Sequence, residues 1–351
     1  MKTEHLISSS ADLRTALEKL NALPGGAMTL FVTDGDGRLC GSLTDGDVRR
    51  ALIGGLSLDS SVSGAMRTPC RSTGAAAVDV AWLRRCRADG ISLVPLTDAE
   101  GRPVDIIDLR HGRSRLPLRA LLMAGGRGER LRPATLTTPK PLLKIEGKCI
   151  IDYNVEALAA CGITDITVAT RYLAEQLEEH FAVPVAGVQA RCMLEKEPLG
   201  TIGAAAMLPP DSRHTLVMNS DLITTVDFEE MYLRHTAGGN AVTIAAVPYQ
   251  VSVPYAVLGT DGADPSRVTS IDEKPSFSYY ANAGIYIFAP EALALLRQGV
   301  RTDATDLVAT AIQRGMRVGY YTIGGTWIDV GSPLDFRQAG DLMRHVRNMN
   351  K

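Results

Sequence analysis

A buried apolar strand that runs directly into a glycine-rich loop constrains this chain most. The segment LMAGGRGERLRPATLTTPKP, residues 122–141, starts with apolar residues and then places Gly125, Gly126 and Gly128 within four positions. Glycine lets a backbone approach a ligand closely and adopt unusual dihedral angles. Exposed backbone N–H groups in such a loop can surround a phosphate. The segment therefore predicts a phosphate-binding loop at the end of a strand.

Basic residues follow these glycines at close intervals. Arg127, Arg130 and Lys140 add positive charge, and an arginine fork matches the geometry of phosphate oxygens. The spacing is neither G-x-x-x-x-G-K-[ST] nor G-x-G-x-x-G, so two common nucleotide loops are excluded. Glycines alone favour an ordinary tight turn, whereas glycines followed by R-L-x-P-x-T and P-K-P form a specific pattern.

Strand and helix patterns alternate over the second part of the chain. We expect strands over residues 119–123, 166–169, 215–218 and 241–247, and helices over residues 151–161 and 172–181. Such alternation is typical of an α/β fold with a mainly parallel sheet. In such sheets ligands bind beyond the carboxyl ends of the strands, which is where the glycine-rich loop begins.

The first part of the chain contains a weak internal repeat. Residues 28–47 align with residues 92–111, and each copy has two apolar strands joined by an Asp- and Gly-containing turn, at residues 34–37 and 98–101. Helical patterns over residues 11–20, 45–52 and 77–87 flank these hairpins. The repeat predicts two similar modules packed on each other. We place this domain at residues 1–116 and the α/β domain at residues 117–351, with the polar segment His111–Pro117 as linker.

Composition excludes several classes of protein. The 351 residues are 45% hydrophobic and 22% charged with a net charge of −2, which argues against a disordered chain and against nonspecific binding of nucleic acid. The six cysteines are scattered without a C-x-x-C pair, and the six histidines form no metal-spaced pair. With no apolar signal-peptide core and no run of about 18 apolar residues, we expect a cytoplasmic protein without a membrane segment.

Four further motifs carry polar residues at strand ends or turns. EPLGTIGA at residues 197–204 breaks a turn and starts a small-residue helix, and MNSD at 218–221 ends a strand with an acid. DEKP at residues 272–275 follows an apolar–polar strand and precedes the strand at 282–288, and WIDVGS lies at 327–332. Each has an ordinary structural interpretation as well: close helix packing, a turn cap, a charged turn before proline, or a helix N-cap at Ser332.

Taken together, these motifs resemble the signature of the sugar-1-phosphate nucleotidylyltransferases. The resemblance implies a Rossmann-like, GT-A-like domain with a mixed, mainly parallel sheet. It implies that the nucleotide is held by the loop and by the small-residue turn: Ala124, Gly125, Gly126, Arg127, Gly128, Gly200 and Thr201. It implies that the sugar phosphate is held by acids, a lysine and a strand start: Glu197, Glu273, Lys274, Asn282 and Gly284.

The catalytic residues that the resemblance implies come from distant parts of the chain. They are Arg130, Lys140, Asp221, Lys274 and Asp329, with Asp221 and Asp329 as carboxylate ligands of Mg²⁺. A small, hard cation between carboxylates and phosphates suits this chemistry. The implied reaction is transfer of a nucleoside monophosphate from a nucleoside triphosphate to a hexose 1-phosphate.

The sequence predicts the substrates less precisely than it predicts the type of reaction. The form PLGTIGA is common among mannose-1-phosphate guanylyltransferase-like members, which favours GTP with mannose, glucose or glucosamine 1-phosphate, for bacterial surface glycan or nonulosonic acid synthesis. A uridylyl- or cytidylyltransferase remains an alternative. So does a catalytically inactive regulatory protein that senses nucleotides or sugars, although the complete residue set argues against it.

The repeat at the N-terminus resembles a tandem pair of CBS modules, a smaller α+β domain. Thr44 and Asp47 match the T-x-x-D element that often holds the ribose of an adenine nucleotide in that family. They also fit a plain helix cap. The second copy has Asp108-Leu-Arg-His111 instead, so at most one good nucleotide site is expected. The resemblance implies regulation, dimerisation or both, and a homo-oligomer.

Overall fold

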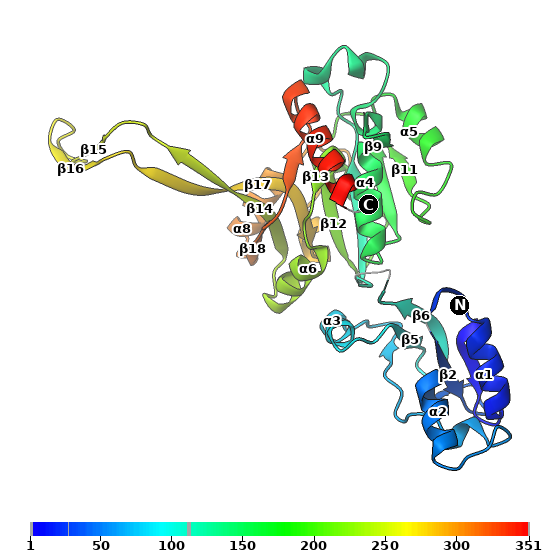
Figure 1. The fold of residues 1–351 in the computed structure, drawn as a ribbon. Helices are drawn as coiled ribbons and strands as arrows, with labels where there is room; N and C mark the ends of the chain where they lie inside the picture. The colour runs from blue at the N-terminus through cyan, green and yellow to red at the C-terminus, as the bar shows by residue number, and fades with distance from the viewer. Residues whose placement is uncertain (1–2, 27, 111–113, 350–351) are drawn as a thin grey trace. The chain divides into compact units, whose positions relative to one another are not determined.

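The computed structural model describes residues 3–26, 28–110 and 114–349, in two compact units (Figure 1). One unit comprises Met1–Pro117 with Ala160–Ile163, and the other comprises Leu118–Ala159 with Thr164–Lys351. Residues 111–113 of the expected linker lie outside the described residues. The domain limits 1–116 and 117–351 stay a prediction. In the described part of the chain, no helix combines the length and the apolar character needed to cross a membrane.

The N-terminal unit is built from two similar modules, as the repeat predicts. Each has a short strand, a helix and an antiparallel hairpin, and the sheet orders are β1-β2-β3 and β4-β5-β6. The first module ends in a helix, α2, after its hairpin, and among the described residues no helix follows the second hairpin. The elements are β1(Leu6–Ser8), α1(Leu13–Ala22), β2(Thr29–Thr33), β3(Leu39–Thr44) and α2(Asp45–Ile53), then β4(Thr73–Gly74), α3(Val80–Ala88), β5(Leu93–Thr97) and β6(Pro103–Asp108).

The two hairpin turns of this unit are made in the same way. Asp34 accepts backbone hydrogen bonds of 2.9 and 2.8 Å from residues 36 and 38, and Asp98 accepts bonds of 3.1 and 2.7 Å from residues 100 and 102. Phe31 of the first module packs with Leu93 and Ile106 of the second. The modules therefore share a small apolar core in addition to their own.

A seven-stranded sheet organises the second unit. Its order is β11-β10-β7-β12-β17-β14-β18, and only β17 runs against the other six strands. This confirms the expected mixed, mainly parallel sheet. The strands are β7(Leu118–Met123), β10(Ile166–Thr170), β11(Arg191–Leu194), β12(His214–Asn219), β14(Val242–Ser252), β17(Ser276–Phe288) and β18(Val318–Thr322).

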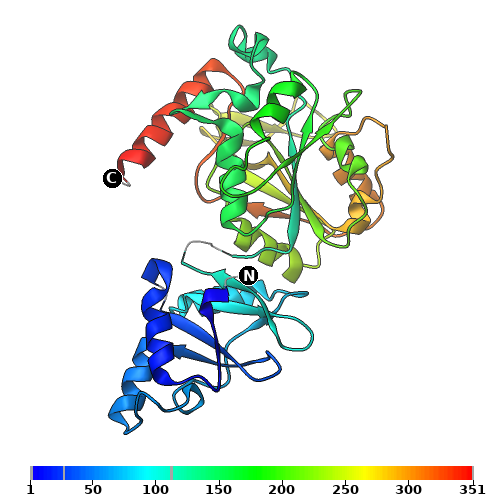
Figure 2. The same cartoon turned by 90° about the vertical axis from the view of Figure 1, so that its right-hand side faces the viewer.

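Helices cover both faces of this sheet (Figure 2). On one face, α8 and the small-residue segment Gly203–Met207 pack on Leu121, Val217 and Phe288. This segment is a 3₁₀-helix and starts a little later than the sequence suggests. The helices of this unit are α4(Ile150–Ala160), α5(Ala174–His180), α6(Phe228–Ala237), α7(Pro290–Leu293), α8(Ala304–Gln313) and α9(Pro333–Met349).

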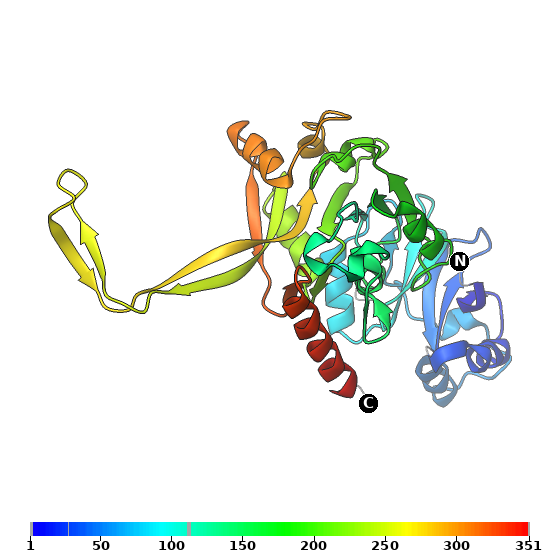
Figure 3. The same ribbon diagram turned by 90° about the horizontal axis from the view of Figure 1, so that it is seen from above.

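Two of the sheet strands continue far beyond the sheet. We expected a strand over 241–247, but β14 continues to Ser252, and β17 starts at Ser276 rather than near residue 282. Within the described part of the chain their outer halves pair only with each other, and they lead to a second hairpin, β15(Val257–Thr260) and β16(Val268–Asp272). We call residues 248–280 the arm; it projects away from the rest of its unit (Figures 1 and 3).

Candidate active site

A pocket of about 670 Å³ lies at the carboxyl ends of the parallel strands. Residues that directly follow four of these strands line it: Ala124 after β7, Arg171 after β10, Glu195 after β11 and Ser220 after β12. Its size is that of a site for a small molecule. The predicted residues that line it are Ala124, Gly125, Gly126, Gly128, Arg130, Lys140, Gly200, Thr201 and Asp221.

The glycine-rich loop forms one wall of the pocket. Gly128 has φ of +59°, and a Cβ there would lie 2.9 Å from Cγ2 of Thr135 and 3.1 Å from Cβ of Lys140. Any side chain at this position would therefore be strained and crowded. A Cβ on Gly126, in contrast, would meet no atom within 4 Å. Arg127 is exposed and is not among the residues that line the pocket.

Two aspartates and a lysine meet at the floor of the site. Asp221 follows β12, and Asp329 ends β19(Trp327–Asp329), which pairs with β13(Leu222–Thr224) so that Leu222 lies opposite Asp329. Lys140 is only 8% exposed and donates a hydrogen bond to Oδ2 of Asp221. Its Nζ lies 3.6 Å from Oδ1 of Asp329, within ion-pair distance but too far for a hydrogen bond. The structure thus brings together three residues that are far apart in the sequence.

The two carboxylates keep an unused capacity to bind a cation. Oδ1 of Asp221 and Oδ1 of Asp329 are both buried without a hydrogen-bond partner. Burial, together with the negative charge of Asp221, raises the pKa of Asp329 above its ordinary value. One lysine cannot neutralise two carboxylates. These oxygens therefore fit a hard divalent cation such as Mg²⁺.

Arg130 is held at the rim of the pocket by a close approach to a backbone. A Cβ on Gly331 would lie 2.8 Å from an Nη atom of Arg130, so the guanidinium packs directly on this glycine. Gly331 belongs to the WIDVGS motif and follows β19. The WIDVGS motif thereby positions Arg130, which follows the glycine-rich loop.

Thr201 connects the pocket wall to the start of α8. Its backbone N–H donates to Oδ1 of Asp303 at 3.0 Å, and its Oγ1 accepts a hydrogen bond of 2.8 Å from the N–H of Ala304. Gly200, with φ of +82°, lies so close to the carbonyl oxygen of Thr302 that a Cβ would be 2.5 Å from it. Both predicted residues therefore have clear structural roles as well as a place on the pocket wall.

The predicted sugar-phosphate residues are not gathered in the pocket. Glu197 is exposed, and Glu273 and Lys274 are exposed on the arm; none of the three lines the cavity. Asn282 donates a hydrogen bond of 2.6 Å to the hydroxyl of Tyr286. Gly284 lies against the side chain of Asn219, which does line the pocket. Gly284 thus lies beside the pocket wall, a few residues beyond the end of the arm, whereas Asn282 is not among the residues that line the pocket.

Four charged residues of the pocket were not predicted from the sequence: Glu129, Arg171, Glu195 and Arg301. Glu195 is 4% exposed, and burial raises the pKa of its carboxyl group. It accepts a hydrogen bond of 3.3 Å from the N–H of Leu199, and it lies beside Gly125. Arg171 and Glu195 directly follow predicted or observed parallel strands, and that position was the signal that could have identified them.

The predicted regulatory residues form a helix cap. Thr44 and Asp47 make a reciprocal capping box at the start of α2, and Asp47 also pairs with Arg50 and Arg67. Burial alone would raise the pKa of Asp47, but the hydrogen bonds from Thr44, Arg67 and Arg50 outweigh it and lower the pKa to about 2. Adenine nucleotide binding here stays a prediction, and a ribose would compete with these contacts.

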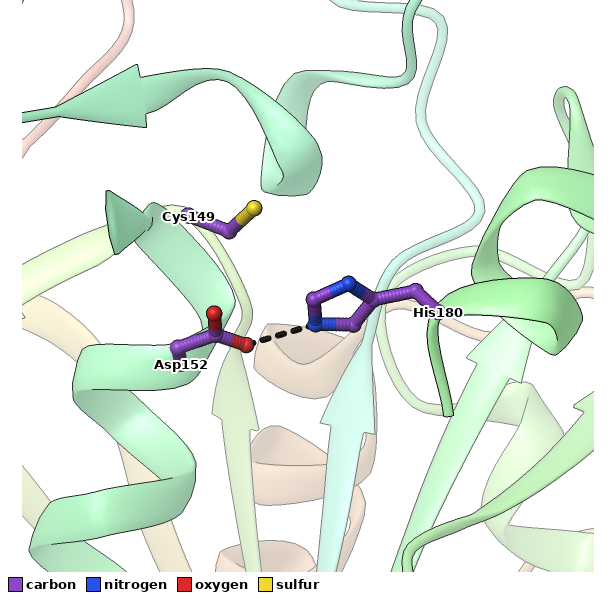
Figure 4. Close-up of side chains that lie close together, drawn as sticks. All are labelled: Cys149, Asp152 and His180. Atoms are coloured by element: carbon purple, nitrogen blue, oxygen red, sulfur yellow. Dashed lines mark hydrogen bonds and ion pairs between the residues drawn. The ribbon is translucent and has the colours of Figure 1, made fainter. Parts of the chain in front are cut away.

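A separate cluster of polar side chains joins β9(Lys148–Cys149), α4 and α5 (Figure 4). Nε2 of His180 lies 2.7 Å from Oδ1 of Asp152, and Cys149 completes a group whose candidate ligand atoms lie within 4.8 Å of one another. Burial raises the pKa of the Cys149 thiol, so a reactive thiolate is disfavoured. None of the three lines the pocket, and the His180–Asp152 contact ties α5 to α4.

Comparison with known families agrees with the site. The profile of the nucleotidyl transferase family matches residues 119–345, and that of the CBS domain matches residues 1–54. The second profile covers the first module of the N-terminal unit, whose α2 has no counterpart among the residues described after the second hairpin.

Similar curated proteins are named mannose-1-phosphate guanyltransferases. The Neurospora crassa protein is 34% identical over 235 residues, which is 62% of each chain. The Danio rerio protein named mannose-1-phosphate guanylyltransferase catalytic subunit beta is 33% identical over 227 residues, also 62% of each chain. The chain thus spans about 62% of the length of these relatives. The solved structure of HddC from Yersinia pseudotuberculosis shares the fold, with a TM-score of 0.50 and 23% identity over 64% of this chain and 99% of that one.

Proposed function

The chain belongs to the nucleotidyl transferase family, and from its pocket we propose that it transfers a nucleoside monophosphate from a nucleoside triphosphate to a sugar 1-phosphate. The observation that carries this proposal is the convergence of Lys140, Asp221 and Asp329 beside the glycine-rich loop. Cations and glycine N–H groups suit the phosphates of the nucleotide, and two orphaned carboxylate oxygens suit the metal ion that accompanies it.

The chemistry needs positioning more than proton transfer. An oxygen of the sugar 1-phosphate attacks the α-phosphorus of the nucleotide, the bond to the β-phosphate oxygen breaks, and pyrophosphate leaves. The attacking phosphate is already an anion, so no general base is required. The barrier comes from the repulsion between two anions and from charge that develops on the leaving group, which aligned cations reduce.

Each basic side chain of the site has a separate role in the proposed reaction. Arg130, at the rim and fixed against Gly331, stabilises the leaving pyrophosphate. Lys140 is buried between the two aspartates and draws the reacting phosphates together. The loop from Gly125 to Gly128 offers backbone N–H groups to the nucleotide, and Lys274 attracts the sugar phosphate.

Asp221 and Asp329 would hold Mg²⁺. When bound, the ion neutralises phosphate charge and orients the two substrates. In this structure the ammonium of Lys140 partly neutralises both carboxylates, and with a metal ion held by them it would be available to the phosphates.

For the substrates we propose GTP and mannose 1-phosphate, with glucose and glucosamine 1-phosphate as next choices. The support is the naming of the similar proteins as mannose-1-phosphate guanyltransferases and the PLGTIGA motif at the pocket wall. We further propose that the product serves surface-glycan or nonulosonic acid synthesis in a bacterial cytoplasm, and that the CBS modules bind a regulatory adenine nucleotide.

The test is pyrophosphate release with Mg²⁺, in which five nucleoside triphosphates are crossed with mannose, glucose, glucosamine and N-acetylglucosamine 1-phosphates. We expect GTP with one hexose phosphate to dominate. A dominant UTP or CTP pair would support the uridylyl- or cytidylyltransferase alternative. Folded protein that binds nucleotide but releases no pyrophosphate with any pair would instead support the inactive sensor.

Asp221→Asn is the diagnostic variant for this panel. It keeps the size of the side chain but removes one of the two charges, so turnover should fall by about 10²–10³-fold. Asp341→Asn is the matched control, because Asp341 is exposed on α9 and pairs only weakly with Arg344. The control should keep wild-type turnover.

A further inference from the structure

The arm has one apolar face and one polar face. In its first part Tyr249 lies opposite Tyr279 and Val251 opposite Phe277, and because side chains alternate along a strand these four share one face. The other face carries Gln250 with Ser278, Ser252 with Ser276 and, at the end nearest the sheet, Pro248 with Tyr280, whose ring centroid lies 4.9 Å from that of Tyr320. The pattern is that of a ribbon that buries one face.

Nothing in the described part of the chain covers that apolar face. The sheet neighbours β12 and β18 pair only with the inner halves of β17 and β14, up to Ile285 and Ala246. Nine of the nineteen exposed large hydrophobic residues described belong to the arm: Tyr249, Val251, Tyr255, Leu258, Val268, Ile271, Phe277, Tyr279 and Tyr280. An isolated two-stranded ribbon is only marginally stable in water. An exposed apolar patch of this size indicates an interaction surface.

The exposed area is large enough for a stable interface. Tyr280 aside, the four aromatic residues of the arm are 43–75% exposed. At about 200 Å² for each whole side chain, their exposed share amounts to about 470 Å². The four aliphatic residues bring the total to about 700 Å², which is within the range that each partner contributes to an interface of ordinary size.

The arm also carries two predicted site residues out of reach of their own pocket. Lys274 lies two residues before β17 starts at Ser276, and Ser276 is eight strand positions before Gly284, which lies against Asn219 of the pocket wall. At about 3.4 Å per residue, that separation is roughly 25 Å along the ribbon. The ladder between β14 and β17 continues to the pair Ser252 and Ser276. The ribbon therefore cannot fold back over its own pocket without breaking those pairs.

We propose that the arm docks on a second copy of this chain and completes that copy's active site with Glu273 and Lys274. Each arm starts near the wall of its own pocket, where Gly284 lies against Asn219. Two arms that pack face to face about a twofold axis perpendicular to them run in opposite directions, so each leads toward the pocket of the other copy. Only an identical copy supplies both a matching apolar face and a pocket that lacks these two residues.

The apolar packing is tested by the mass of the full chain in sedimentation. We expect a mass of at least two chains for the wild type. The double variant Tyr249→Ser with Phe277→Ser should sediment as a monomer. Its matched control, Gln250→Ala with Ser278→Ala, changes the opposite face of the same ribbon segment and should keep the wild-type mass. A monomeric wild type, or equal masses for both double variants, would overturn the proposal.

The exchange of Lys274 is tested by complementation between chains, which rests on the proposed function. Asp221→Asn and Lys274→Ala chains with different tags are co-expressed and the mixed dimer is purified through both tags. If each arm serves the other pocket, one site of this dimer has both changes and one has none, so turnover is about half that of the wild type. If each arm serves its own pocket, both sites are impaired and turnover stays at the level of the single variants.

The two readouts separate the two claims. A Lys274→Ala homodimer with full turnover would overturn the delivery of Lys274. A wild type that releases no pyrophosphate would refute the proposed function, while the masses in sedimentation still decide whether the arm joins two copies. Circular dichroism and thermal unfolding of each variant show that it is folded.

Discussion

The guanidinium group of Arg130 packs on the bare backbone of Gly331, two hundred residues further along the chain. The contact joins the loop after β7 to the loop after β19, so two segments that are far apart in the sequence together position the Arg130 side chain. A methyl group on Gly331 would occupy the space that an Nη atom of Arg130 now fills.

Gly331→Ala should therefore impair catalysis without impairing folding. A flexible arginine can move aside, so we expect the melting temperature to stay within about 2 °C. Displacement of the cation by about 1 Å should lower kcat/KM for pyrophosphate release by about 10- to 100-fold. Gly324→Ala is the control, because a Cβ there meets nothing within 4 Å. Equal kcat/KM for both variants would refute the role of this contact.

Gly128 and Gly126 should respond differently to the same substitution. Gly128→Ala forces a side chain into a backbone with φ of +59° and against Thr135 and Lys140. We expect a loss of about 1–2 kcal/mol or more in urea-induced unfolding. Gly126→Ala should unfold as the wild type does but bind nucleotide more weakly, since its methyl group points into open space that the substrate needs. Similar unfolding curves for both variants would contradict this.

The buried pair of His214 and His235 should make stability depend on pH. Nδ1 of His214 lies 2.7 Å from Nε2 of His235, and His235 is fully buried. Burial, together with His214, lowers the pKa of His235 to about 4. The unfolded chain takes up this proton near pH 6.5, so between these values it binds more protons than the folded chain, and stability falls as the pH falls from about 6.5 to about 4.

At about 1.4 kcal/mol for each unit of pKa shift, the loss attributable to His235 amounts to about 3 kcal/mol at pH 4. His235→Gln should flatten this slope in urea unfolding at a series of pH values. His345 is exposed on α9, so His345→Gln should keep the wild-type slope. An unchanged slope in the His235 variant would refute the assignment.

The order of strands and helices could be predicted because each strand of the sheet is an apolar run followed by polar residues. The strand over residues 118–123 and the helix over residues 150–160 lie within one residue of the prediction. The helix predicted over 172–181 begins only at Ala174, because Leu173 adopts φ of +51°. That backbone conformation depends on the local path of the chain and cannot be recognised from the spacing of apolar residues.

The arm could not be predicted in the same way. Residues 249–252 and 276–279 alternate apolar and polar side chains, as an ordinary half-buried strand does, and only the structure shows that no described layer lies against their apolar face. Likewise, Arg171 and Glu195 belong to no motif; their role follows from the strands that precede them. The proximity of Lys140 and Asp329 could be predicted only from the family resemblance, because nearly two hundred residues separate them in the sequence.

The most direct test of the proposed reaction follows the phosphorus atoms themselves. GTP labelled at the α-phosphate is incubated with mannose 1-phosphate, Mg²⁺ and the enzyme, and GTP labelled at the γ-phosphate is treated in parallel. Transfer of the nucleoside monophosphate predicts that the α label enters a sugar nucleotide and the γ label enters pyrophosphate. Appearance of the γ label in orthophosphate, with the α label left in GDP, would show that a different bond breaks and would contradict the account.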